Sequence, residues 1–250
     1  NHLYQDMAYF IHKVQPKIFL FENVEGLIRS RWTNSGIKGE IFKDVLETFR
    51  NLKGYEVKSK LVYAKDYGVP QNRPRILIIG IKRKLLKKNN VSPDALEGGF
   101  LPNPTNDYPN LEDVLSDLID QSYENGGSTD IYLSEPKSNW QKLIRSNEFS
   151  GESLKKGDQL NEHKYSNHKE SVMNRFDYMI KNNGAIPDSY KTKKFAQRVL
   201  PKKWNDKGPN ITACSLADDF VHFSQPRSLT VREWARLQTF PDWYLFAGKR

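Results

Sequence analysis

The sequence predicts an α/β fold, with a layered sheet in the first third of the chain and a smaller, irregular domain after it. Two short apolar runs, at residues 18–21 and 76–81, have the length and the β-branched and aromatic content of buried strands. Between them, residues 39–52 carry apolar side chains at helical spacing. Residues 1–82 are therefore expected to form helix, strand, helix, strand and strand, part of a layered α/β sheet.

The first helix and strand follow from residues 2–22. Residues 2–14 place five apolar side chains on one helical face, and Pro16 follows this segment: Leu3, Met7, Phe10, Ile11 and Val14. The run at 17–22 is continuous rather than alternating, which predicts a strand buried on both faces. It ends in an acid, Glu22, and an amide, Asn23.

The second helix and the next two strands follow from residues 39–81. Gly54 stands where the helix at 39–52 is expected to stop. Residues 55–64 alternate between apolar and polar side chains, as a half-buried strand does. The segment 65–75 has the glycine and prolines of a loop, and 76–81 reads as another buried strand.

The character of the chain changes after Ile81. Residues 84–226 are rich in Asn, Ser, Lys, Gly and Pro, with short helices expected only at 110–120 and 170–180. Residues 227–250 regain order, because Thr230 and Glu233 form a capping-box pattern at the start of a helix with an apolar stripe. We expect three parts: 1–83, a first domain that contains the sheet; 84–226, a second domain; and 227–250, a closing helix returning toward the first.

Composition limits the classes of function. The net charge of +9 fits a phosphate-rich partner, although a basic surface without such a partner is an equal alternative. The single cysteine, Cys214, excludes an internal disulfide framework and a cysteine-rich zinc site, and favours the cytoplasm. No apolar stretch has the length of a membrane span, no signal-peptide pattern is present, and the five histidines show no metal-ligand spacing.

Glu22 and Asn23 are the first candidate site, at the carboxyl end of a predicted strand. Ligands of open α/β sheets bind outside the carboxyl ends of the strands. A carboxylate at this place can exchange a proton with a bound ligand. The alternative is that Glu22 only caps a helix or pairs with a lysine.

Gln71, Arg73 and Arg75 are the second candidate site, within the segment "YGVPQNRPRILIIG". If residues 71–75 are extended, these three side chains share one face. Guanidinium groups suit phosphate and base carbonyl oxygens because they offer a planar fork of donors. The alternative is a surface strand whose arginines pair with carboxylates.

Taken in order, these segments resemble the DNA (cytosine-5) methyltransferase family. The Glu22-Asn23-Val24 stretch is similar to that family's Glu-Asn-Val motif, and 71–75 is similar to its Gln-x-Arg-x-Arg motif. Residues 227–246 resemble the helix that closes its target-recognition region. The resemblance implies part of a Rossmann-like methyltransferase sheet plus a target-recognition domain. It also implies double-stranded DNA as partner and S-adenosylmethionine as cofactor.

The resemblance implies a role for each motif residue. Glu22 corresponds to the acid that holds and protonates N3 of a flipped cytosine, and Asn23 to the residue that orients the catalytic loop. Arg75 corresponds to the group reaching the base carbonyl O2, and Arg73 to the one steadying the nucleophile loop or a phosphate. Gln71, Arg73 and Arg75 would contact the DNA.

Three motifs of that family have no counterpart here: its nucleophile motif, its glycine-rich cofactor motif and the Asn-centred motif that follows its closing helix. The chain has no Pro-Cys-Gln nucleophile motif, and Cys214 lies in a recognition-region segment, so we assign it no catalytic role. No G-x-G stands before residue 34, which places most of the cofactor site outside this chain. We therefore expect that the chain alone cannot methylate DNA.

Three interpretations remain open. The chain is a fragment of a longer methyltransferase, one subunit of a split methyltransferase, or a non-catalytic DNA-binding module. In the last case the Lys and Arg clusters at 82–88, 191–194 and 202–203 would contact phosphates. A restriction-modification role is the usual setting for bacterial members of the family, and the residues of 84–226 that read bases cannot be ranked from the sequence.

Overall fold

The computed structural model describes residues 2–105, 109–191, 197–202, 209–210 and 220–248. The chain divides into two compact units. The first unit contains residues 1–66 and 74–105, and the second contains residues 67–73 and 106–250. The segment 67–73 thus belongs to the second unit although the residues on both sides of it belong to the first.

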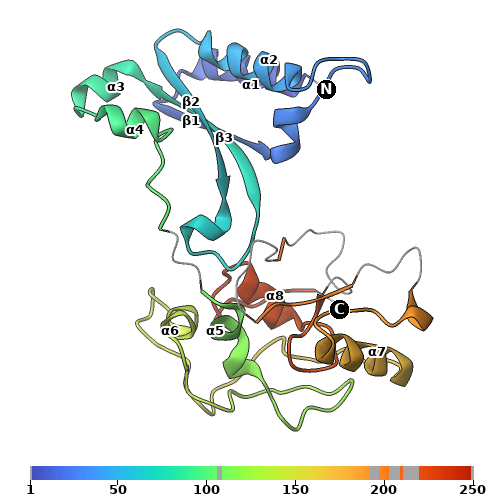
Figure 1. Cartoon of the computed structure of the whole chain (residues 1–250). Helices are drawn as coiled ribbons and strands as arrows, with labels where there is room; N and C mark the ends of the chain where they lie inside the picture. Colours follow the sequence, from blue (N-terminus) through green and yellow to red (C-terminus); the bar gives the residue numbers. More distant parts are fainter. Residues whose placement is uncertain (1, 106–108, 192–196, 203–208, 211–219, 249–250) are drawn as a thin grey trace. The chain divides into compact units, whose positions relative to one another are not determined.

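The first unit is a three-stranded sheet with helices packed against it (Figure 1). Its elements are α1 (Leu3–Val14), β1 (Ile18–Val24), η1 (Glu25–Arg29), α2 (Glu40–Arg50), β2 (Tyr55–Tyr63), η2 (Ala64–Tyr67), β3 (Pro74–Lys82), α3 (Arg83–Lys88) and α4 (Pro93–Glu97). The strand order is β1-β3-β2, and β3 is antiparallel to both neighbours. The predicted order of helix, strand, helix, strand and strand over residues 1–82 is confirmed.

The core of this unit lies between the sheet and the helices α1 and α2. Its buried members come from five elements, and all of them are apolar or aromatic: Tyr4, Ala8, Ile11, Phe19, Val45, Phe49, Tyr55, Val57 and Ile78. The rings of Phe19 and Phe49 lie 5.5 Å apart between their centroids, and Phe19 meets Tyr55 edge-on at 5.3 Å. Burial of apolar and aromatic area therefore stabilises this unit.

The prediction that the first strand is buried on both faces is wrong. Phe19 is buried against the helices, whereas Ile18, Leu20 and Val24 are each more than half exposed. The physical reason is the alternation of side chains in a strand, which turns these three residues to the face opposite α1 and α2. An unbroken apolar run alone does not distinguish one covered face from two.

Gly80 fixes the pairing of β1 with β3. Phe19 is the register partner of Gly80, and its ring lies over the glycine. A Cβ atom at position 80 would overlap the Phe19 ring, so a side chain there would require the ring to move. A shift of the register by one residue would place Ile79 or Ile81 opposite Phe19, and the packing therefore favours this register.

The second unit is built from short elements (Figure 1), which surround an apolar core. These are α5 (Leu111–Leu115), η3 (Ser116–Leu118), α6 (Asn139–Arg145), α7 (Glu170–Lys181), η4 (Asp188–Tyr190), β4 (Arg198–Val199), β5 (Phe220–Val221) and α8 (Val231–Leu237). The core gathers side chains from α5, α8 and the loops around them, among them Leu111, Tyr132, Leu160, Phe220 and Trp234. The helices expected within 110–120 and 170–180 are present as α5 and α7.

The division of the chain differs from the expected one in two places. The first unit continues to Thr105, because α3 and α4 lie with the sheet, whereas the expected boundary was at 83. The closing helix α8 belongs to the second unit and contacts α5 there. Within the described residues, no helix combines the length and the apolar character needed to cross a membrane.

Candidate active site

Glu22 and Arg75 form an ion pair in the first unit. Val24 is the register partner of Arg75, so Glu22, two residues before Val24, is its diagonal neighbour on the same face of the sheet. The Nε of Arg75 lies 2.5 Å from Oε1 of Glu22. The Glu22 side chain is 52% exposed and that of Arg75 is 18% exposed. The structure thus brings together two residues that are 53 positions apart, and leaves the carboxylate accessible to a ligand.

Asn23 points to the other face of β1 from Glu22, because neighbouring side chains in a strand alternate. Its Oδ1 accepts a hydrogen bond from the N–H of Val24 at 2.9 Å. This bond fixes the amide at the end of the strand, next to the start of η1.

Gln71 and Arg73 lie in the segment 67–73 of the second unit. Gln71 is 2% exposed, and its Nε2 donates a hydrogen bond to Oε1 of Gln238 at 3.1 Å. The N–H of Gln71 donates to the carbonyl of Val69 at 2.7 Å, which forms a tight turn. Arg73 is partly buried.

The expectation that Gln71, Arg73 and Arg75 share one extended face is not met. Residue 71 is at a bend, and β3 begins only at Pro74. The reason is that the hydrogen bond from the N–H of Gln71 to the carbonyl of Val69 closes a turn there. The extended strand begins only after this turn. Gln71 and Arg73 therefore belong to the second unit, and Arg75 belongs to the sheet.

The remaining sequence candidates are spread over both units. Arg83, Lys84, Lys87 and Lys88 are exposed on α3. Cys214, residues 192–194 and residue 203 lie outside the described residues.

The helix α8 begins with the predicted capping box. The Oγ1 of Thr230 accepts the N–H of Glu233 at 3.2 Å, and the Glu233 carboxylate accepts the N–H of Thr230 at 2.8 Å. Arg227 adds a bidentate pair to the same carboxylate, at 2.7 and 2.8 Å. Burial alone would raise the pKa of Glu233, but Arg227 outweighs burial and holds that pKa well below its usual range. Glu233 is therefore a structural carboxylate that stays ionised.

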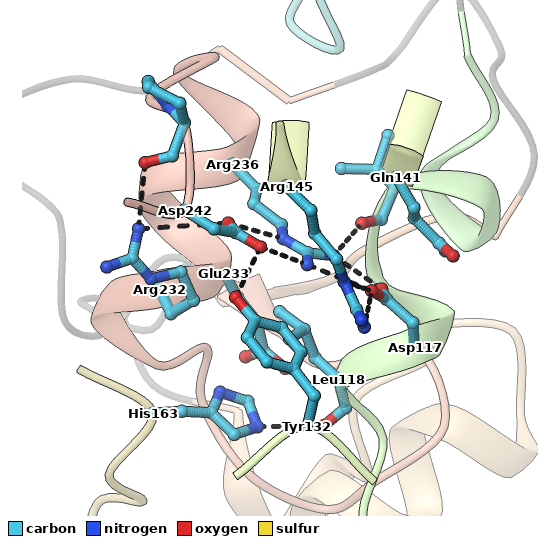
Figure 2. A network of polar contacts seen from close by, with 12 residues as sticks. Asp117, Leu118, Tyr132, Gln141, Arg145, His163, Arg232, Glu233, Arg236 and Asp242 are labelled. Carbon is cyan, nitrogen blue, oxygen red and sulfur yellow. Dashed lines mark hydrogen bonds and ion pairs between the residues drawn. The ribbon is translucent and has the colours of Figure 1, made fainter. Parts of the chain in front are cut away.

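A second network of buried charges joins α8 to three other segments (Figure 2). Arg236 donates to both oxygens of Asp117, at 2.5 and 3.0 Å, and to both oxygens of Asp242, at 2.6 and 3.0 Å. Arg145 also binds Asp117, with its Nε at 2.9 Å, and stacks 3.8 Å from the centroid of the Tyr132 ring. The side chains of all three ion pairs are fully buried.

The charges of this network balance one another. Burial alone would raise the pKa of Asp117, but Arg236 and Arg145 outweigh it and hold the pKa below its usual range. Burial also raises the pKa of Tyr132, and the Asp242 carboxylate that accepts its hydroxyl adds to the effect. Two arginines and two aspartates are thus paired, as buried charges must be.

Two buried histidines lie next to α8. The Nε2 of His163 is 2.9 Å from the carbonyl oxygen of Leu118, and its Nδ1 is 2.9 Å from the Thr230 hydroxyl. Because a carbonyl only accepts, Nε2 carries the hydrogen, and Nδ1 accepts from Thr230. Burial lowers the pKa of His163 to about 4 and that of His222 to about 3. Both histidines are neutral at physiological pH.

Sequence reasoning missed this charged core. Asp117, Arg145, Arg236 and Asp242 are separated by up to 125 positions, and charged residues are ordinarily assigned to the surface. The pattern of α8 gave no warning either. Arg232, Glu233 and Arg236 share one side of the helix, opposite Val231, Trp234, Ala235 and Leu237, as in a helix with a solvent face.

The described sheet contains no glycine-rich turn of the kind that cradles a nucleotide-like cofactor. A glycine-rich turn between a strand and a helix is the usual cradle for such a group. In the described sheet, β1 leads into η1 and β3 leads into α3 without a turn of this kind. No group of three or more His, Cys, Asp or Glu side chains in the described parts of the chain is arranged to hold a metal ion.

A match to a protein-family model identifies the family of this chain. The family model described as C-5 cytosine-specific DNA methylase matches residues 1–250. The chain belongs to this family. Among its methylase relatives, the type II methyltransferase M.DdeI of Desulfomicrobium norvegicum is 29% identical over 270 residues, and M1.HphI of Haemophilus parahaemolyticus is 28% identical over 253 residues. Both alignments cover 100% of this chain, which spans 59% and 54% of the two relatives.

The methylase fold is also supported by a solved structure. A prophage-encoded DNA modification methyltransferase of E. coli superposes with a TM-score of 0.64 at 22% identity. The match covers 98% of this chain and 65% of that one. The α/β methyltransferase fold expected from the sequence is confirmed.

Proposed function

We propose that this chain carries the base-holding acid and the target-recognition part of a DNA (cytosine-5) methyltransferase. The observation that supports the proposal best is the pair of Glu22 and Arg75, at 2.5 Å on one face of the sheet. An acid and a guanidinium side by side match the N3 and O2 edge of cytosine, which offers two adjacent acceptors to two donors. Membership of the methylase family supports the same assignment.

The chemistry requires a base that has left the duplex stack. Glu22, in its protonated form, would donate a hydrogen bond to N3, and Arg75 would donate to the carbonyl O2. Both contacts withdraw electron density from the ring, and C6 becomes more electrophilic. The half-exposed carboxylate of Glu22 gives a base access to this contact.

The covalent step needs groups that this chain does not supply. A cysteine thiolate from outside the chain would add to C6, which makes C5 nucleophilic. S-adenosylmethionine, with most of its site outside the chain, would supply the methyl group when bound. Loss of the C5 proton and expulsion of the thiolate would then restore the aromatic ring. The role of Glu22 is to give a proton to N3 as the thiolate adds and to take it back when the thiolate leaves.

Other residues would position the DNA and the reacting groups. Asn23 would orient the catalytic loop, and Arg73 would steady that loop or a phosphate. Gln71, Arg73 and Arg75 would contact double-stranded DNA, and the basic face of α3 would add phosphate contacts. Because the relatives are type II methyltransferases, we propose a cytoplasmic restriction-modification role for the protein.

The test is Glu22→Gln in the full-length gene product. The amide cannot deliver a proton to N3, so methyl transfer to cytosine is expected to fall by about 100-fold or more. DNA binding is expected to change by less than about threefold, because the change removes no contact with a phosphate. Glu47→Gln, on the exposed face of α2, is the matched control and should leave the rate unchanged. A rate of methyl transfer for Glu22→Gln within a few-fold of wild type would contradict the assignment of Glu22 as the acid at N3.

A second experiment separates a methyltransferase part, as a fragment or a split subunit, from a DNA-binding module. The purified 250-residue chain is mixed with DNA and labelled cofactor, alone and with the remaining segment of the full-length protein or a candidate partner subunit. If the chain transfers no methyl group by itself but does so after the addition, the result supports a part of a methyltransferase. Transfer by the chain alone contradicts the proposal that the thiol lies elsewhere, and binding without transfer in both mixtures favours a DNA-binding module.

A further inference from the structure

Gln71 is a buried amide in the loop of the Gln-x-Arg-x-Arg motif. It is 2% exposed, and burial of a primary amide costs free energy unless its donors and acceptors find partners. One partner is the side chain of Gln238, whose Oε1 accepts the Nε2–H of Gln71 at 3.1 Å. The two glutamines are 167 positions apart. The contact joins residues 67–73, here called the motif loop, to Gln238, the residue that follows α8.

Gln238 stands on a rigid support. Its N–H donates to the carbonyls of Trp234 and Ala235, and it caps the carboxyl end of α8. All side chains from Arg232 to Leu237 are buried, and the helix is held at its start by the capping box and along its length by the ion pairs of Arg236. A side chain on such a helix presents its acceptor at a defined place.

The motif loop is held at a second point in the same unit. The N–H of Asn72 donates to the carbonyl of Pro209 at 2.7 Å. Arg73 follows directly, and Pro74, with its restricted backbone, begins β3. Fixing residues 71 and 72 therefore limits where Arg73 leaves the loop.

We infer that Gln238 is a positioning residue for the motif loop of this methyltransferase. Its acceptor holds Gln71, and through Gln71 it sets the place of Arg73 without itself meeting the base. The inference rests on the proposed function for its effect on catalysis, but the contact and its effect on the loop can be tested independently. A small displacement of a positioned group costs a large factor in rate.

Gln238→Met tests the role, because methionine has a similar length but no strong acceptor. In the full-length gene product, kcat for methyl transfer is expected to fall about tenfold, with the KM for DNA changed by less than about threefold. Hydrogen exchange of the backbone amides of residues 67–73 is expected to accelerate by a similar factor, and the thermal unfolding midpoint should change little. Gln238→Glu keeps an acceptor for the Gln71 amide and should restore slow exchange and most of kcat.

Two controls make the result specific. Gln121→Met, at an exposed turn of the same unit, should leave exchange of 67–73 and kcat unchanged. Gln71→Met combined with Gln238→Met should slow the reaction no more than Gln71→Met alone, because both changes break the same contact. Additive losses would overturn the inference, since the two residues would then act separately.

The outcomes distinguish this inference from the proposed function. Unchanged exchange and kcat in Gln238→Met, within an active enzyme, would overturn the inference and leave the proposed function standing. An inactive wild-type gene product would contradict the proposed function, and exchange at 67–73 would still decide whether Gln238 holds the loop.

Discussion

The two units of the molecule use charge in opposite ways. In the first unit, the core is apolar and aromatic, and the ion pair of Glu22 with Arg75 lies on the open face of the sheet with a half-exposed carboxylate. In the second unit, Asp117, Arg236 and Asp242 lie inside, with side chains that are fully buried. A charged pair is available for chemistry in the first unit and serves as part of the framework in the second.

This difference predicts which kinds of substitution each unit tolerates. An apolar core loses stability in steps that follow the volume removed. A buried set of charges fails when one member is taken away, because the remaining charge has neither water nor a partner. Substitutions that destabilise one unit and spare the other test this contrast.

Arg236→Met should have the largest effect on stability. It leaves Asp117 and Asp242 without their shared guanidinium, and removing one partner of a buried pair costs about 3–5 kcal/mol. Chemical denaturation, with hydrogen exchange to assign the loss, should show that the second unit is destabilised and the sheet of the first is not. Lys181→Ala, which removes an exposed pair with Asp177, is the control and should cost about 0.5 kcal/mol or less. Equal effects of the two variants would contradict the contrast.

Acid should weaken the second unit before it affects the first. Above pH 6.5 His163 and His222 are neutral in both the folded and the unfolded chain. Between pH 6.5 and their folded pKa values of about 4 and about 3, only the unfolded chain takes up the protons, so stability falls as pH falls. Between pH 7.5 and pH 5 the loss should be on the order of 2 kcal/mol for each histidine.

The variant His163→Gln separates the contribution of one histidine. Glutamine can keep a donor and an acceptor but does not titrate, so the pH dependence of unfolding between pH 7.5 and pH 5 should drop by about half. The carboxylates do not interfere in this range, because their usual pKa values lie below it. Denaturation curves at a series of pH values check this, and an unchanged slope would show that His163 is not the group responsible.

Ile78→Val should have the smallest of these effects. Ile78 is fully buried at the centre of the sheet, and loss of one methyl group there costs about 0.5–1.5 kcal/mol. Denaturation should show a modest loss confined to the first unit, with no change in the acid response of the second. A loss as large as that of Arg236→Met would mean that the apolar core is as intolerant as the charged one.

Much of the first unit could be predicted because its signals are local. The apolar face of residues 3–14, the alternation at 55–63 and the run at 76–81 each depend on neighbours in the sequence, and each became the expected element. The capping box of Thr230 and Glu233 is local as well. The Glu22 and Arg75 motifs could be recognised, although their contact depends on a register that the sequence does not state.

The second unit was less predictable because its determinants are distant in the chain. Nothing near Asp117 indicates that Arg145 and Arg236 will neutralise it, 28 and 119 positions later. The exposure of Ile18 and Leu20 was also missed, since the covering of a strand face depends on elements elsewhere. Local pattern predicts elements, and it does not predict which partners surround them.

The membership of residues 67–73 in the second unit has a practical consequence for chimaeric enzymes. A fusion that exchanges the second unit at a single cut near residue 106 would leave the Gln71 loop from one parent and Gln238 from the other. The exchanged cassette should instead comprise two pieces, the short loop and the long carboxyl-terminal segment, taken from the same parent. In laboratory hybrids, any property of the second unit would then be inherited from a discontinuous stretch of the gene.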